Sequence, residues 1–262
     1  KAVSMSADQF SRLPVADQRA LLARVFKGRV EHARNIYYEI RQTDTPYDYR
    51  DGQLGKPREE GLRWVHRHWQ MGTTYRIDTD MYPPGEKEVF RWVSSGFNGE
   101  EGVGRYTLRA KEGKRTFGRI DTVHDRVARG LRYRYWLDGE YPNKTDYLFP
   151  CLLHWEGEFD VQAPVEGDKV QLAVPYQPTW AEKPLGKRAL LLDPQKGFLP
   201  IRGDLRWDYQ FPEPVSGEDG FTVKESFTVQ ESRLVGDVWM PIKLRDEVTS
   251  SLNPDAIAIH ET

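Results

Sequence analysis

The stretch Leu62-Arg63-Trp64-Val65-His66-Arg67-His68 decides the fold class, because its side chains alternate in chemistry with a period of two. Successive side chains of a β-strand point to opposite faces of a sheet, so Leu62, Trp64 and the two histidines share one face, and the two arginines share the other. The same alternation recurs in residues 131–135, 205–209 and 240–244. It predicts an antiparallel sheet with an aromatic inner face and an arginine-rich outer face.

The composition fits one globular domain and excludes several classes of protein. The 262 residues carry a net charge of -2, with 30% charged residues of mixed sign, so no basic field indicates a nucleic-acid partner. No apolar run approaches the roughly 18 residues that a transmembrane helix needs. Cys151 is the single cysteine, which excludes an internal disulfide, and its apolar neighbours predict a small buried side chain.

Residues 1–34 form the helical part of the chain. Pro14 suits the first turn of a helix, where its missing N–H costs nothing. An apolar stripe at helical spacing follows, made of Leu21, Leu22, Val25 and Phe26. This stripe needs an apolar partner, so we expect the helix to lie across the sheet as a lid.

Residues 35–250 read as a meander of short strands separated by turn signals such as Met71-Gly72 and Gly236-Asp237. No fixed-period repeat and no linker divides them, and the tail after Ser250 is expected to be loose. The predicted fold is therefore a single α+β domain spanning 1–262. Its core is a strongly curved antiparallel sheet, an unclosed β-barrel of about a dozen strands, with an N-terminal helix across the concave face.

The aromatic face is the candidate ligand-binding site. Counting alternate positions places nine aromatic residues on it, and the helix adds two apolar ones; the set is Trp64, Tyr75, Phe90, Trp92, Tyr106, Tyr133, Tyr135, Trp207, Tyr209, Leu22 and Phe26. These side chains either fill the core beneath the helix or line a cavity. A single helix is short for so many strands, and apolar surface that it leaves uncovered favours a loop, a partner or a ligand.

His66 and His68 are the alternative site, since two histidines on one strand face can share a metal if a third ligand arrives. Asp78 and Asp80 lie on the next strand, but on the side that alternates away from the histidines. We therefore expect no metal and no cofactor. The arginines Arg63, Arg67, Arg76, Arg91 and Arg109 are expected to form a solvated outer face.

Two C-terminal stretches carry a family resemblance. They are LDPQKGFLPIR at residues 192–202 and ESRLVGDVWMPIK at residues 231–243. Both resemble the last hairpins of uncharacterised secreted proteins in the LolA-like group of bacterial envelope proteins, which includes lipoprotein carriers. The order of one N-terminal helix followed by a strand meander is similar to that group as well. The resemblance implies an unclosed barrel with helices across an apolar cavity.

The function that the resemblance implies is non-enzymatic binding or carriage of a lipid-like or acyl ligand, such as a lipoprotein acyl chain or another apolar small molecule. It also implies a periplasmic or secreted location, with a signal peptide already removed, and an envelope protein as partner. Two alternatives stay open. One is a protein-interaction or sensor module that uses the open sheet. The other is a hydrolase with a site near His66 and His68.

Overall fold

The computed structural model describes residues 4–32, 35–51, 53–71, 74–97, 102–110, 113–121, 160–176, 185–215 and 218–261. Two helices, α1 (Ala7–Ser11) and α2 (Val15–His32), precede the strands. The strands are β1 (Asn35–Arg50), β2 (Gln53–Pro57), β3 (Leu62–Met71), β4 (Thr74–Tyr82), β5 (Arg91–Phe97), β6 (Gly102–Ala110), β7 (Gly113–Asp121), β8 (Asp160–Val165), β9 (Lys169–Tyr176), β10 (Gly186–Asp193), β11 (Leu199–Val215), β12 (Glu218–Val235), β13 (Val238–Ser250) and β14 (Asn253–Glu261). A short 3-10 helix, η3 (Pro194–Lys196), joins β10 to β11.

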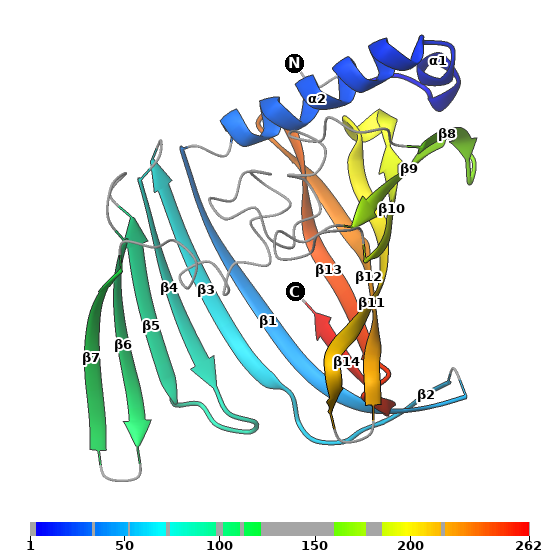
Figure 1. Cartoon of the computed structure of the whole chain (residues 1–262). Helices are drawn as coiled ribbons and strands as arrows, with labels where there is room; N and C mark the ends of the chain where they lie inside the picture. Colours follow the sequence, from blue (N-terminus) through cyan, green and yellow to red (C-terminus); the bar gives the residue numbers. More distant parts are fainter. Residues whose placement is uncertain are drawn as a thin grey trace.

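The described strands form one antiparallel sheet in the order β7-β6-β5-β4-β3-β1-β14-β13-β12-β11-β10-β9-β8, with β2 paired to β1. The first wing runs from β1 at the centre of the sheet to β7 at one edge. The second wing runs from β8 at the other edge back to β14, which lies beside β1. Among the described strands β7 and β8 end the order and do not pair, so the sheet is unclosed. Figure 1 shows a strongly curved sheet with α2 lying across one end, between the two wings, as the sequence predicted.

The C-terminal residues correct one expectation. The tail after Ser250 is not loose, because β14 runs between β1 and β13 and pairs with both. Ile257 and Ile259 alternate with alanines along this strand, and their side chains are 5% and 2% exposed. This short apolar alternation is a strand signal that the boundary at Ser250 left out.

The two helices pack on the second wing. Ser6 caps α1 through a capping box with Gln9, and Phe10 contacts the ring of Phe198 at a centroid distance of 5.1 Å. The backbone N–H of Ala7 donates to the Asp168 carboxylate at 2.5 Å, which ties α1 to the hairpin between β8 and β9. The buried cluster beneath the helices consists of Ala7, Phe10, Leu21, Leu22, Val170, Leu172, Leu190, Leu192, Phe198, Phe227 and Leu244.

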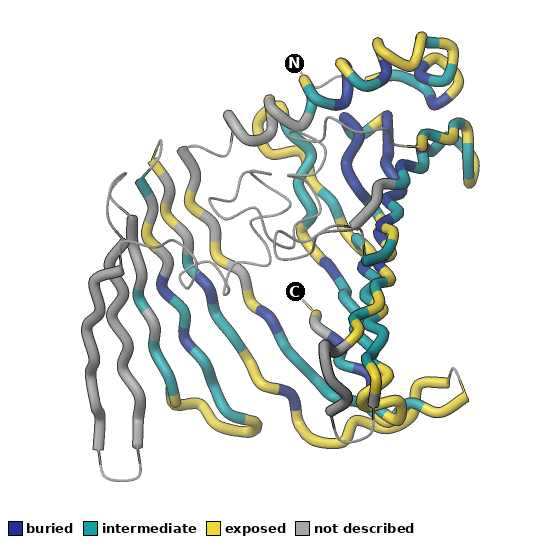
Figure 2. The backbone as a smooth tube through the Cα atoms, viewed as in Figure 1, coloured by how far each residue is buried: buried dark blue, intermediate teal, exposed yellow. Residues whose placement is uncertain are grey.

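The position of this cluster shows which part of the sheet the helices cover. Its strand members come from β9, β10, β12 and β13, and none of the described residues in it comes from β1, β3 or β4. Figure 2 shows the same asymmetry, with buried segments concentrated where the helices meet β9 and β10. The predicted lid thus packs on one wing of the sheet.

Leu22 tests this packing because its side chain is 1% exposed. Leu22→Ala should lower the free energy of unfolding by about 2–5 kcal/mol, since it removes buried apolar contacts and leaves a cavity. Val15→Ala on the same helix is the control, because Val15 is 60% exposed and should change stability by no more than about 0.5 kcal/mol. Urea unfolding measures both. Equal losses in the two variants would show that the helix does not take its stability from the sheet.

Candidate ligand-binding face

The concave side of the sheet is named the inner face here, and cross-strand register defines it. Trp64 on β3 lies opposite Gln42 on β1 and Met81 on β4. From β1, the cross-strand pairs continue through β14 and β13 to Phe227 on β12, which belongs to the cluster beneath the helices. Pairing of β12 with β11 then puts Trp207 on the same side as Phe227. Paired residues project to the same side of a sheet. Trp64 and Trp207 therefore share the inner face, as the alternation predicted.

The aromatic residues of β11 and β12 form a second group on this face. Trp207 and Tyr209 each lie 5.4 Å from the ring of Phe221, measured between centroids. All three are half-buried, and they are not members of the cluster that the helices cover. They give the inner face an aromatic wall below the helix-covered part.

The other predicted residues lie on strands, in α2 or outside the described residues. Tyr75 and Tyr106 occupy strand positions in register with the inner face. Leu22 belongs to the helix-covered core, and Phe26 lies within α2. Tyr133 and Tyr135 lie outside the described residues, and so does Cys151.

Three residues at the start of β5 differ from their prediction. Trp92 pairs with Asp80, whose position alternates with the inner face, so Trp92 faces outward. Arg91 takes the inner position opposite Met81, contrary to its expected place on the outer face. Phe90 precedes β5 and is 44% exposed. The error arose because the loop between β4 and β5 resets the register, and alternation read along one strand cannot be carried across such a loop.

A buried polar group interrupts the apolar inner face at β3. His66 is 7% exposed, its Nδ1 lies 2.9 Å from Oγ1 of Thr79, and its ring stacks on Trp64 at 6.0 Å with an interplanar angle of 7°. Beside them the Gln42 amide donates to the Asp44 carboxylate. Burial lowers the pKa of His66 to about 4, against a smaller opposing effect of Asp44 and Asp80. The imidazole is therefore neutral at pH 7 and acts as a hydrogen-bonding group without charge.

The hydroxyl–imidazole pair of Thr79 and His66 is the feature closest to catalytic machinery. A general base works best with a pKa near the operating pH, and a pKa of about 4 makes His66 a weak base at neutral pH. Within the described part of the chain, no three potential metal-ligating side chains gather. The Thr79–His66 pair is therefore poorly suited to transferring a proton at neutral pH.

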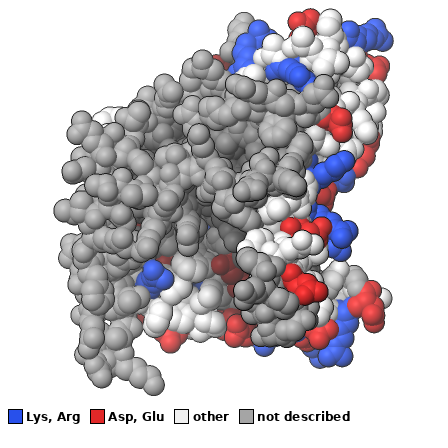
Figure 3. Space-filling model, in the orientation of Figure 1, with Lys and Arg blue, Asp and Glu red and all other residues white. Residues whose placement is uncertain are grey.

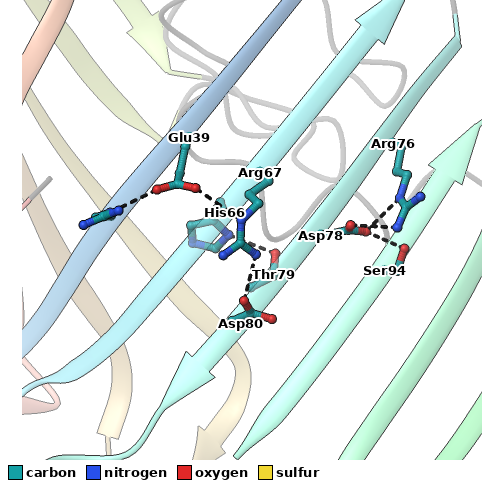
Figure 4. Close-up of polar contacts among 9 residues, drawn as sticks. Glu39, His66, Arg67, Arg76, Asp78, Thr79, Asp80 and Ser94 are labelled. Atoms are coloured by element: carbon teal, nitrogen blue, oxygen red, sulfur yellow. Dashed lines mark hydrogen bonds and ion pairs between the residues drawn. The ribbon is translucent and has the colours of Figure 1, made fainter. Parts of the chain in front are cut away.

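Asp78 and Asp80 lie on the outer face, on the side away from His66, as the alternation predicted. Both are 8% exposed. Figure 4 shows how arginines enclose them: Arg67 reaches Asp80 at 2.8 Å and Glu39 at 3.2 Å, while Arg76 and Ser94 bind Asp78. These carboxylates are structural partners of the outer arginines.

The described surface carries both signs of charge side by side. In the view of Figure 3, Lys and Arg alternate with Asp and Glu along the wing that carries the helices, and no field of one sign dominates it. In the part of the chain that the structure describes, neither helix has the length and apolar character needed to cross a bilayer.

The buried imidazole predicts a pH dependence. His66 has a pKa of about 4 in the fold against 6.5 for the free side chain, so the unfolded chain binds the proton more readily. The stability that a neutral His66 contributes is present above pH 6.5 and is lost as the pH falls towards 4. The native chain should lose about 3 kcal/mol more than His66→Gln over this range, measured by urea unfolding. Parallel losses in the two proteins would mean that His66 titrates normally.

No family model matches the sequence, and no curated protein matches it. Among solved structures, the chain is similar to the crystal structure of the LolA superfamily protein NE2245 from Nitrosomonas europaea. The TM-score is 0.38 and the identity 8%, over 91% of this chain and 90% of that one. The match is too distant to carry a ligand or an activity from one protein to the other, so the evidence for function comes from the inner face itself.

Proposed function

We propose that the protein binds or carries a lipid-like or acyl ligand on its inner face, without catalysing a reaction, in the bacterial envelope or after secretion. One observation carries the proposal. The helices cover the part of the inner face formed by β9, β10, β12 and β13, while Trp64 and the group around Trp207 are half-buried aromatic residues outside that cluster. Half-buried aromatic side chains are the predominant lining of sites that bind apolar ligands.

The chemistry of the face suits a ligand with an apolar body and one polar end. Binding sites of this class are mostly apolar, with a few placed polar groups that fix orientation. Each methylene that an acyl chain buries contributes about 0.8 kcal/mol. The neutral His66 places one polar side chain among the apolar ones without the desolvation cost of a buried charge.

A second candidate function is a protein-interaction module, and an outer-face cluster favours it. Tyr37 and Trp69 are 53% and 37% exposed, and their rings lie 5.2 Å apart. Met71, at 74% exposure, follows Trp69 on the same face. Exposed aromatic and methionine side chains are enriched in protein interfaces.

Trp64 and Trp69 lie on one strand and face opposite sides, so they separate the two candidates. Trp64→Ala should weaken binding of a fluorescent fatty acid by about tenfold, which is about 1.4 kcal/mol. Trp69→Ala is the matched control and should leave the affinity unchanged. Fluorescence titration gives both dissociation constants, and native mass spectrometry should find lipid bound to the purified native chain.

The opposite pattern would refute ligand binding on the inner face. Fatty acid that binds equally well to the native chain and to Trp64→Ala would place the ligand elsewhere. A purified chain that carries no lipid and has no affinity for fatty acid would leave the interaction module as the better account.

A further inference from the structure

The convex side of the same strands carries a cavity of about 430 Å³ that the ligand proposal does not use. Its walls come from β1, β3, the end of β4 and the loop that follows β4. Register places Thr43, Arg63 and Tyr82 side by side across three strands, and places Arg41 opposite Val65 and Glu39 opposite Arg67. All of these positions alternate with the inner face. Most of the lining therefore belongs to the outer face, and Gln42 and Trp64 are the two lining residues whose positions belong to the inner face. The cavity is called the outer-face groove below.

The groove is cationic. Four of its lining residues are positively charged, namely Arg41, Arg63, Arg67 and Lys87, and Glu39 is negatively charged. Asp80, which pairs with Arg67, adds a second negative charge beside the lining, so the local excess is +2. Glu39 is ionised, since a hydrogen bond from Arg41 and the charges of Arg41 and Arg67 hold its pKa below the usual value. This local excess stands out in a chain whose net charge is -2.

Two of the cations are already held in place. The Arg63 guanidinium donates to the backbone carbonyl of Glu86 and lies 5.4 Å from the centre of the Tyr82 ring. Arg67 is held between Glu39 and Asp80 by hydrogen bonds of 3.2 and 2.8 Å. Figure 4 shows this arrangement for Arg67. Side chains fixed before binding lose less conformational freedom when a ligand arrives.

The groove also has spare hydrogen-bond donors. A guanidinium has five N–H donors. Arg41 uses its Nε to reach Glu39, and its side chain is otherwise 82% exposed. Arg63 uses Nη2 for the Glu86 carbonyl. Lys87 is exposed and makes no ion pair with any residue that the structure describes. Arginine N–H groups and one ammonium therefore remain available around one groove.

We propose that this outer-face groove binds a phosphate monoester group, supplied either by a lipid headgroup such as that of phosphatidic acid or by a free phosphate ester. A carboxylate fills one guanidinium fork, whereas a phosphate offers three oxygens and a charge of about −1.5 to −2 to several cations at once. That charge offsets most of the local excess of +2. The inference does not depend on an acyl ligand on the inner face, because all the charged residues of the groove lie on the opposite side of β1 and β3 or in the loop after β4.

Titration calorimetry at low ionic strength tests the site with inorganic phosphate as the probe, because salt screens exposed charges. The native chain should bind phosphate more tightly than acetate. The double variant Arg41→Gln/Lys87→Gln should weaken phosphate binding by about tenfold, which a loss of about 1.4 kcal/mol would produce. Both side chains are exposed, so the variant should fold normally, and thermal unfolding checks this.

The matched control is Arg233→Gln/Lys187→Gln, which removes the same two charges from exposed positions on β12 and β10. It should bind phosphate within about twofold of the native chain. Phosphate binding that falls equally in both double variants would reflect net charge alone and would overturn the proposal. Acetate bound as tightly as phosphate would overturn the ligand class.

Vesicles identify the source of the phosphate. Binding to phosphatidylcholine vesicles that contain phosphatidic acid, lost in Arg41→Gln/Lys87→Gln and retained in the control, would assign the groove to a lipid headgroup. Binding of free phosphate without binding to such vesicles would assign it to a free phosphate ester. If neither probe binds the native chain, the groove is not a phosphate site.

Discussion

Packing of helices α1 and α2 on the second wing is the interaction on which the rest of the structure depends. Phe10, Leu21 and Leu22 take their apolar partners from β9, β10, β12 and β13. Most of the stability of a helix in a protein comes from such packing, so this contact fixes where the helices lie. Within the described part of the chain, the cluster beneath these helices has no member from β1, β3 or β4. The aromatic groups around Trp64 and Trp207 lie outside this cluster.

The first wing has different side chains on its two faces, although the sheet between them is one layer of backbone. On the inner face, His66 is neutral and stacks on Trp64. On the outer face, Arg67 holds Glu39 and Asp80, and Arg76 holds Asp78. Because neighbouring residues of a strand project to opposite sides, one stretch of sequence supplies both an apolar wall and a charged one. The proposed acyl site and the proposed phosphate site are therefore formed by the same strands.

Alternation within a strand was enough to predict much of this arrangement. It assigned Trp64 and Trp207 to one face and turned Asp78 and Asp80 away from His66, and the register agrees. It failed at Trp92, because the loop after β4 resets the register and a local pattern has no knowledge of the partner strand. Alternation within one strand also could not predict the outer-face groove. That groove joins Arg41, Arg63 and Lys87, whose proximity depends on pairing between β1, β3 and β4 and on the loop.

The pairing of β1 with β14 has a consequence for how the chain folds. These strands meet in the middle of the sheet although they come from opposite ends of the strand region, so Thr43 pairs with Glu261. During synthesis the first wing is complete long before its central neighbour leaves the ribosome, and β1 must wait with one edge unpaired. Contacts between distant parts of a chain slow folding, and an unpaired strand edge invites aggregation. A chain truncated before residue 253 would lack β14, so this edge of β1 would stay unpaired and prone to aggregation.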